Sequence, residues 1–245
     1  MDLDAVIFDW GGTLTRWHDI DFHAESLALA AAVTTTGHDS ALRDGSSLAS
    51  SGTAEHAAAL HGAGEVIWGR AREHQRSSTL GDLFDVAGLE HDPALLTAYR
   101  EFWEPHTYTD PEVRPLFERL HADGLRVGVL SNTIWPREWH VGFFERDGVY
   151  DLVDGDVYTS EIPWTKPSPR AFRAAMDAVH VSDPTRCVYV GDRLFDDVWG
   201  ARRAGMRAVH IPLSTIPPGQ VGHAVGTPDA VVRALSELPE VLASL

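Results

Sequence analysis

The side chains best suited to chemistry fall in four short segments. In chain order they are Phe8-Asp9-Trp10-Gly11-Gly12-Thr13-Leu14, Leu130-Ser131-Asn132-Thr133, Lys166-Pro167, and Gly191-Asp192 with Asp196 and Asp197. A carboxylate can attack phosphorus as a nucleophile. An acidic pair binds Mg²⁺, and a lysine and a hydroxyl neutralise and hydrogen-bond phosphate oxygens. These residue types therefore indicate phosphoryl transfer through a covalent aspartate.

Regular elements must place these segments together. Residues 5–8 form a continuous apolar run, which is typical of a buried parallel strand. Further strands are expected at 125–130, near 156–158, at 187–190, at 207–211 and, as an edge strand, at 230–232. Helices are expected between them at 113–121, 139–145, 168–179, 198–204 and 234–242. Alternating strands and helices predict an α/β fold with a parallel sheet, in which polar residues at the strand ends meet at one edge.

Between the first strand and this alternation, residues 17–110 show a helical texture. Apolar or small residues recur at helical spacing at Leu27, Ala31 and Thr34, and again at Leu60, Gly64, Ile67 and Ala71. A further helix is expected at 92–103. Breaks rich in Ser and Gly fall at 44–52 and 77–81. This stretch predicts a helical bundle inserted after the first strand.

Composition limits the partners and the location. The chain has 245 residues, with 20 Lys plus Arg against 36 Asp plus Glu and a formal charge of −16. This balance argues against nucleic acid, whose phosphates are bound by Lys and Arg. The longest apolar run, 27–33, is too short to cross a membrane. The single Cys187 and the absence of a recognisable signal peptide favour a cytoplasmic protein.

One basic residue stands out. Lys166 is the only lysine among the 20 basic residues, and all the others are arginines. If only charge mattered at this position, arginine would be the expected residue. The retained lysine is therefore a strong candidate for a functional role.

In order and spacing, the four segments resemble the motifs of the haloacid dehalogenase-like (HAD) hydrolase superfamily. The resemblance covers about residues 3–211. It implies a doubly wound, Rossmannoid core made of residues 1–15 and 111–245, with a helical cap of the C1 type at residues 16–110. Only residues 133–165 separate the second and third motifs, which leaves no room for the other cap type.

The resemblance also implies a role for each motif residue. Asp9 resembles the nucleophile and a metal ligand, and Asp192 and the Gly11 carbonyl resemble further ligands of a Mg²⁺ ion. Asp197 resembles the acidic partner that helps to hold the metal water or the lysine, with Asp196 as a weaker substitute. Among the remaining motif residues, Ser131 and Lys166 resemble phosphate binders, while Thr13 and Asn132 resemble supporting residues.

The sequence departs from the family pattern at Gly11. Most phosphatases of this family have an aspartate there, which protonates the leaving group and then activates water. General acid–base catalysis is typically worth ~10²–10⁴-fold. The expected function is a Mg²⁺-dependent phosphatase of small phosphorylated metabolites, a monomer or homodimer, that acts through an aspartyl-phosphate. Another group would supply the proton, and His18 and Asp19 are nearest in sequence.

Other functions agree less well with the residues. A catalytically impaired binding protein would keep the same fold. A dehalogenase needs no leaving-group proton, but dehalogenases of this family lack the Gly-Asp pair present here as Gly191-Asp192. Phosphonate cleavage uses a cap lysine as a Schiff base, and residues 16–110 contain no lysine. A receiver-type signalling domain would carry its acidic pair first and its lysine last, the reverse of the order here.

Overall fold

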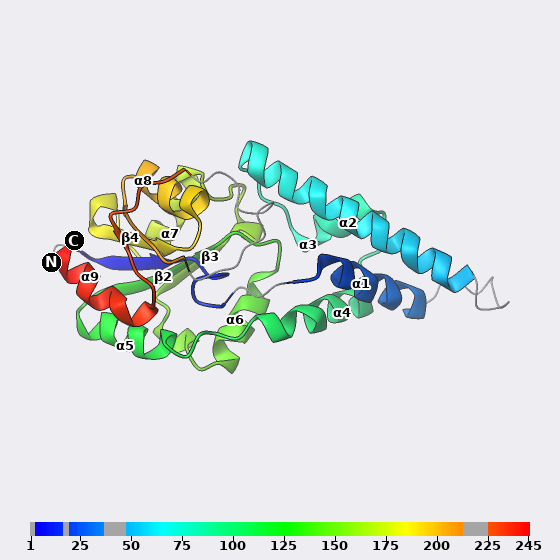
Figure 1. Ribbon diagram of the computed structural model, residues 1–245, viewed down its shortest axis with the longest axis horizontal. Coiled ribbons are helices and arrows are strands. Elements are labelled where there is room, and N and C mark those ends of the chain that lie inside the picture. Colours follow the sequence, from blue (N-terminus) through cyan, green and yellow to red (C-terminus); the bar gives the residue numbers. More distant parts are fainter. Residues whose placement is uncertain (1–2, 17–19, 37–47, 213–224) are drawn as a thin grey trace.

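A parallel β-sheet forms the centre of the fold. A computed structural model describes residues 3–16, 20–36, 48–212 and 225–245. Its strands are β1 (Ala5–Phe8), β2 (Arg126–Ser131), β3 (Gly155–Tyr158), β4 (Cys187–Gly191), β5 (Arg207–His210) and β6 (Ala230–Val231). They form one sheet in the order β3-β2-β1-β4-β5-β6, with all pairs parallel (Figure 1). The predicted parallel α/β fold is confirmed.

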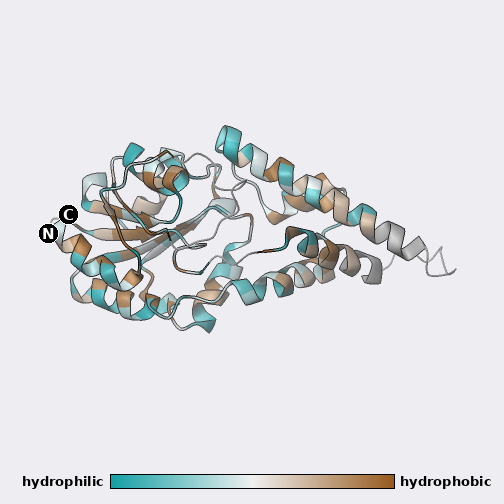
Figure 2. Ribbon diagram, in the orientation of Figure 1, coloured by the Kyte–Doolittle hydropathy of each residue, from teal (hydrophilic) through white to brown (hydrophobic). Residues whose placement is uncertain are grey.

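Both faces of the central strands are buried, because helices cover both sides of the sheet. On one face, Val6 and Phe8 join a cluster with Phe117 of α5 (Val113–Ala122). On the other face, Ile7 joins a cluster with Phe172 of α7 (Pro169–Ala178). Alternate residues of β1 thus face opposite layers, as the period of a strand requires. Figure 2 shows the largely apolar strands between helices that carry polar residues on their outer sides.

The remaining helices of this layered part are α6 (Arg137–Arg146), α8 (Gly200–Arg203) and α9 (Leu238–Ser244). One predicted helix starts differently from the expectation. The stretch expected to be helical from 198 begins with a π-helical turn, Leu194–Trp199, and continues as α8. Within this turn, Asp197 Oδ2 accepts a hydrogen bond of 2.8 Å from the Arg193 backbone N–H. Wider turns of this kind are frequent at functional sites.

Four helices form a separate group, the helical lobe, beyond the carboxyl ends of the strands (Figure 1). They are α1 (Phe22–Thr36), α2 (Leu48–His74), α3 (Leu80–Ala87) and α4 (Pro93–Trp103). The predicted spacing in α2 holds, since Leu60 and Ile67 are both buried. The predicted break at 44–52 is wrong for 48–52, which begin α2, and residues 44–47 lie outside the described residues.

Helix α3 was not predicted, and it begins inside the second expected break. Thr79 caps its N-terminus in a capping box with Asp82, and Gly88 ends it in the left-handed conformation. This spacing is a recognised helix-start signal, which the Ser and Gly residues around it obscured. The division of the chain at 15/16 and 110/111 stays a prediction.

The two chain segments that enter and leave the helical lobe lie side by side. Thr15 and Thr109 form an antiparallel bridge, and the Asp110 N–H donates to the Leu14 carbonyl at 2.8 Å. Arg16 Nε donates to Asp110 Oδ2 at 2.7 Å. Within the described residues, no helix is long and apolar enough to cross a membrane.

The contact between β3 and α7 leaves no space for a side chain at position 155. A Cβ on Gly155 would lie 2.4 Å from the Ala178 carbonyl oxygen, which is a backbone atom. We expect Gly155→Ala to lower the free energy of unfolding by ~1–3 kcal/mol, because α7 must shift. Urea denaturation measures this change.

Gly62 provides the matched control, since an added Cβ there meets nothing within 4 Å. Gly62→Ala in α2 is expected to raise stability by roughly 0.5–1 kcal/mol, because alanine favours a helix over glycine. If Gly155→Ala is as stable as the wild type, the close approach of β3 and α7 is wrong.

Candidate active site

The polar residues at the strand ends meet where the strand order reverses. β1 lies between β2 and β4, so its carboxyl end opens at the point where α/β folds bind their ligands. Asp9 follows β1, Ser131 ends β2 and Asp192 follows β4. These three residues are buried, as are Lys166 and Asp197, so the structure brings together the principal residues picked out in the sequence.

The Lys166 ammonium is the centre of this site. Its Nζ donates to Asp9 Oδ1 at 2.6 Å, to Asp197 Oδ1 at 2.8 Å and to the Tyr189 hydroxyl at 2.9 Å. A lysine has three protons to donate, and each has an acceptor here. Burial opposes the charge of Lys166, but Asp197 and Asp9 outweigh it and raise its pKa. The lysine therefore remains an ammonium ion.

Asn132 holds the backbone of this lysine from the neighbouring loop. The Lys166 N–H donates to Asn132 Oδ1 at 2.8 Å, and Asn132 Nδ2 donates to the Lys166 carbonyl at 3.1 Å. The Tyr189 hydroxyl in turn donates to the Leu130 carbonyl at 3.0 Å. Asn132, which we predicted to be a supporting residue, thus joins the second and third motifs through these hydrogen bonds.

Three carboxylates next to the lysine form a group that suits a metal ion. Asp9, Asp192 and Asp197 each offer an oxygen, and these oxygens lie within 4.8 Å of one another. Gly12 makes this approach possible, because it has a φ of +91° and a Cβ on it would lie 2.6 Å from Asp192 Oδ2. Mg²⁺ prefers oxygen ligands at ~2.0–2.1 Å, so a small closure of the group would complete the contacts.

Asp197 differs from the other two carboxylates in this group. One of its oxygens accepts from Lys166 and the other from the Arg193 N–H, and its side chain is fully buried. Asp9 and Asp192 are therefore better placed for direct metal contact. Asp197 is better placed to hold the lysine, or a metal through water.

The charges of the site favour the binding of a cation. Asp9, Asp192, Asp196 and Asp197 carry negative charge, while Lys166 and Arg193 are the cations that act on them. Burial raises the pKa of Asp9, and although Lys166 opposes this shift, Asp197 adds to it. Burial also raises the pKa of Asp196 to about 6. A divalent cation among these carboxylates would restore the balance.

The other residues selected from the sequence have mixed outcomes. Gly11 and Ser131 line the same cavity as Asp9. Thr13 is buried, but its hydroxyl has no hydrogen-bond partner among the described residues, so its supporting role stays a prediction. His18 and Asp19 lie outside the described residues.

A cavity of about 550 Å³ lies between the catalytic residues and the helical lobe, and we call it the interlobe cavity. Asp9, Ser131 and Lys166 line one end. Helices α1 to α4 contribute apolar walls and two carboxylates, Glu25 and Glu65. Glu25 Oε1 accepts from Trp103 Nε1 at 2.7 Å. Burial raises the pKa of Glu25, although its hydrogen bonds with Trp103 and Tyr99 oppose the shift.

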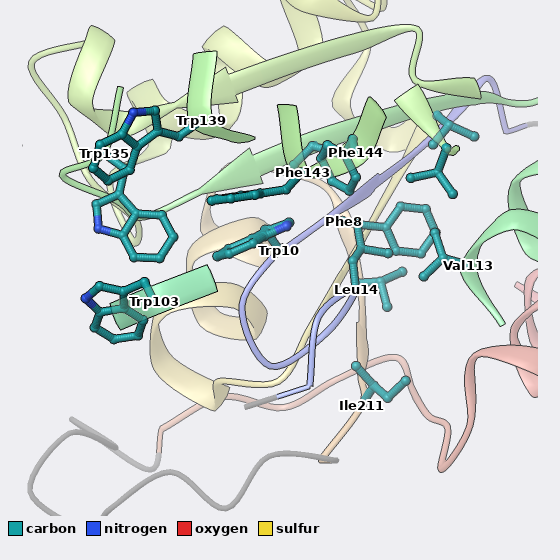
Figure 3. Packing of buried hydrophobic residues seen from close by; sticks show 14 of the residues in the cluster. Phe8, Trp10, Leu14, Trp103, Val113, Trp135, Trp139, Phe143, Phe144 and Ile211 are labelled. Atoms are coloured by element: carbon teal, nitrogen blue, oxygen red, sulfur yellow. The ribbon is translucent and has the colours of Figure 1, made fainter. Parts of the chain in front are cut away.

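An aromatic cluster connects this cavity to the core. Trp10, directly after Asp9, lies 5.7 Å from Trp135 and 4.7 Å from His140 between ring centroids, and Trp135 lies 5.1 Å from Trp103 of the helical lobe. Figure 3 shows Trp10 beside Phe143, with Trp135 and Trp103 continuing the series. Trp10 thus lines the cavity, as its place in the first motif suggests.

Three residues near the site were missed in the sequence. Tyr189 lies inside β4, where its position in the sequence is typical of a core residue. Only the alternation of side chains along β4 indicates which face of the sheet it lies on. Arg193 lines the interlobe cavity and directly follows Asp192 of the fourth motif. His140 lies on α6, outside the four motifs, and its Nε2 is 3.2 Å from Thr133 Oγ1.

Comparison with known proteins agrees with this fold and site. Residues 3–205 match the pattern of haloacid dehalogenase-like hydrolases. A protein of Mycobacterium tuberculosis named phosphatase MT3486 is 38% identical over 168 residues, which are 67% of this chain and 68% of that protein. A glyceraldehyde 3-phosphate phosphatase of Methanopyrus kandleri is 28% identical over 185 residues, which are 74% of this chain and 77% of that protein.

Solved structures show the same architecture. A HAD phosphatase from Thermococcus onnurineus matches with a TM-score of 0.64 and 24% identity, covering 98% of both chains. The parallel sheet with a carboxylate-and-lysine site at its reversal point defines a hydrolase of the α/β class. The chain belongs to the haloacid dehalogenase-like hydrolases, and it resembles the phosphatases among them.

The pH dependence of stability provides a test of the aromatic cluster. Burial lowers the pKa of His140 to about 3, whereas an unfolded histidine titrates near ~6.5. Below pH ~6.5 the unfolded chain binds a proton that the folded chain does not, so stability is lost as the pH falls towards 3. When the pH is lowered from 8 to 5, the free energy of unfolding of His140→Phe should increase by about 2 kcal/mol relative to that of the wild type.

Urea denaturation at both pH values measures this difference. His23 is an exposed histidine of α1, and His23→Phe is the control that should show no comparable change. Parallel pH profiles for the wild type and His140→Phe would mean that His140 is not buried as a neutral residue.

Proposed function

We propose that this protein is a Mg²⁺-dependent phosphatase of small phosphorylated metabolites that acts through an aspartyl-phosphate on Asp9. The observation that carries the proposal is the contact of 2.6 Å between Asp9 Oδ1 and Lys166 Nζ, beside Asp192 and at the end of a cavity. The phosphatase names of its relatives support the same reaction. We further propose a cytoplasmic protein, monomeric or homodimeric, that binds neither nucleic acid nor membrane.

Each residue of the site has a distinct role in the proposed reaction. Lys166 and Ser131 bind the oxygens of the phosphoryl group, which places phosphorus next to Asp9. A carboxylate oxygen of Asp9 attacks phosphorus, and the bond from phosphorus to the leaving-group oxygen breaks. Water then attacks the phosphorus of the aspartyl-phosphate, which releases inorganic phosphate and regenerates the carboxylate. Asn132 and Asp197 keep the lysine in position during both steps.

A metal ion would be held by Asp9, the Gly11 carbonyl and Asp192, with Asp197 acting through water. When bound, Mg²⁺ neutralises phosphate oxygens and charge that develops on them. The three converging carboxylates and the negative balance of the site fit such an ion.

Covalent labelling tests the nucleophile. We expect an intact-mass increase of one phosphoryl group when the protein is mixed with acetyl phosphate and Mg²⁺, because the aspartyl-phosphate lacks a strong acid/base residue to speed its hydrolysis. Asp9→Asn should abolish both the adduct and phosphate release. Asp177→Asn, at an exposed aspartate of α7, should behave like the wild type.

This experiment also separates the alternative functions. Failure to form an adduct or to release phosphate, with ligand binding intact, would favour a binding protein of the same fold. Release of halide from 2-chloropropionate would favour a dehalogenase. A 2-haloacid dehalogenase of Pseudomonas syringae shares the architecture at 26% identity, with a TM-score of 0.60 and 99% coverage of both chains.

Restoring an acid at position 11 tests the proton donor. Gly11 is not among the residues with a left-handed φ, so aspartate is compatible with the backbone there. We expect Gly11→Asp to raise kcat on glycerol 3-phosphate by up to ~10²-fold, the lower end of the usual effect of an acid/base. Acetyl phosphate, which leaves without a proton, should respond much less.

Gly11→Asn is the matched variant, because it has the same shape without an acidic proton. An equal gain with Asn would show that position 11 acts through packing. No gain with Asp would show that another group already supplies the proton.

A further inference from the structure

The walls of the interlobe cavity are mostly apolar. Away from the catalytic end, the lining includes the apolar side chains of Phe22, Leu29, Leu60, Trp68, Leu83 and Trp103, together with a few polar ones such as Glu25, His61, Glu65 and Arg72. Ligand sites of ~300–1,000 Å³ usually combine such walls with a few polar groups. A three-carbon phosphate would leave most of this surface in contact with water. The cavity therefore fits a larger, apolar leaving group.

The aromatic residues form a continuous wall from the nucleophile outwards. Trp10 adjoins Asp9, Trp135 lies 5.7 Å from Trp10, and Trp103 lies 5.1 Å from Trp135, with the successive rings inclined at 70° and 66° (Figure 3). The hydrogen bond from Trp103 Nε1 to Glu25 fixes the far ring. Aromatic surfaces in these orientations favour another aromatic ring through edge and offset contacts.

The chemistry of the nucleophile loop independently selects the same kind of leaving group. Gly11 carries no acid, so this loop suits a leaving oxygen that departs with little protonation. A phenol such as that of tyrosine ionises near pKa ~10, whereas the pKa of an alcohol is far higher and resembles that of water. An aryl oxygen therefore leaves far more easily from this site than an alkyl oxygen.

From these two observations we infer that the leaving group is a bulky phenol, so that the enzyme is an aryl phosphatase. The phosphoryl group lies at Asp9 and Lys166, and the aryl ring lies against Trp10, Trp135 and Trp103. The bond from phosphorus to the phenolic oxygen breaks, and the phenolate leaves with both electrons and takes a proton from water. This inference rests on the proposed phosphatase function and names its substrate class.

Four substrates separate the size of the leaving group from its leaving ability. 2-Naphthyl phosphate is bulky with a good leaving group, and acetyl phosphate is small with an even better one, because it leaves as a carboxylate. Benzyl phosphate is bulky with a poor leaving group, and glycerol 3-phosphate is small with a poor one. Burial of an aromatic ring should give benzyl phosphate a kcat/KM at least roughly tenfold above that of glycerol 3-phosphate. 2-Naphthyl phosphate should in turn exceed benzyl phosphate, because its phenolic oxygen leaves more easily than an alkyl oxygen.

Two glycines of α2 provide matched variants that test the location. Gly64 lines the interlobe cavity and Gly62 is not among its lining residues, while a Cβ on either meets nothing within 4 Å. Gly64→Phe should therefore lower the ratio of kcat/KM for 2-naphthyl phosphate to that for acetyl phosphate by about tenfold. Gly62→Phe, which adds the same side chain on the exposed side, should leave this ratio unchanged.

The outcomes distinguish the two levels of the proposal. If none of the four substrates releases phosphate and none labels Asp9, the phosphatase function itself is wrong. If phosphate is released but benzyl phosphate equals or exceeds 2-naphthyl phosphate, or glycerol 3-phosphate equals or exceeds benzyl phosphate, only the aryl class is wrong. If Gly64→Phe and Gly62→Phe have the same substrate ratio, the aryl ring does not occupy the interlobe cavity.

Discussion

The structure depends on one buried ammonium ion. Lys166 holds Asp9 from the first motif and Asp197 from the fourth, and Asn132 from the second holds its backbone. Removing one partner of a buried charge pair typically costs about 3–5 kcal/mol, because the other charge stays buried without compensation. The ends of three strands must therefore meet at the lysine for the fold to be stable. The same constraint that orders the fold also assembles the candidate active site.

The residues at the catalytic end of the cavity could be predicted from the sequence, because each motif is a short continuous segment. Asp9, Ser131 and Asp192 stand at the ends of apolar runs that predict buried strands, and parallel strands bring such ends to one edge. The helical spacing in α2 could likewise be predicted, since Leu60 and Ile67 both lie on its buried face. These predictions needed only short stretches of sequence.

The rest depended on contacts between distant segments. Trp164 stands two residues before Lys166, which favours a place in the wall of the catalytic cavity, but the guanidinium groups of Arg76 and Arg170 lie over its ring and it borders a different hollow. Tyr189 and His140 act through hydrogen bonds that no spacing in the sequence reveals. The interlobe cavity is lined by residues from several elements, so its apolar character emerges only when the helices are packed.

The burial of Lys166 also allows local opening of the site to be measured by chemical labelling. Lysine acylation requires an exposed, unprotonated amine, and the only lysine side chain here is buried and bound by two carboxylates. In the folded state, an amine-reactive label can react with Lys166 only when the ammonium separates from these carboxylates and loses its proton. The rate of labelling would then report the free energy of that local opening, as hydrogen exchange does for backbone amides. No second lysine side chain would contribute to the signal.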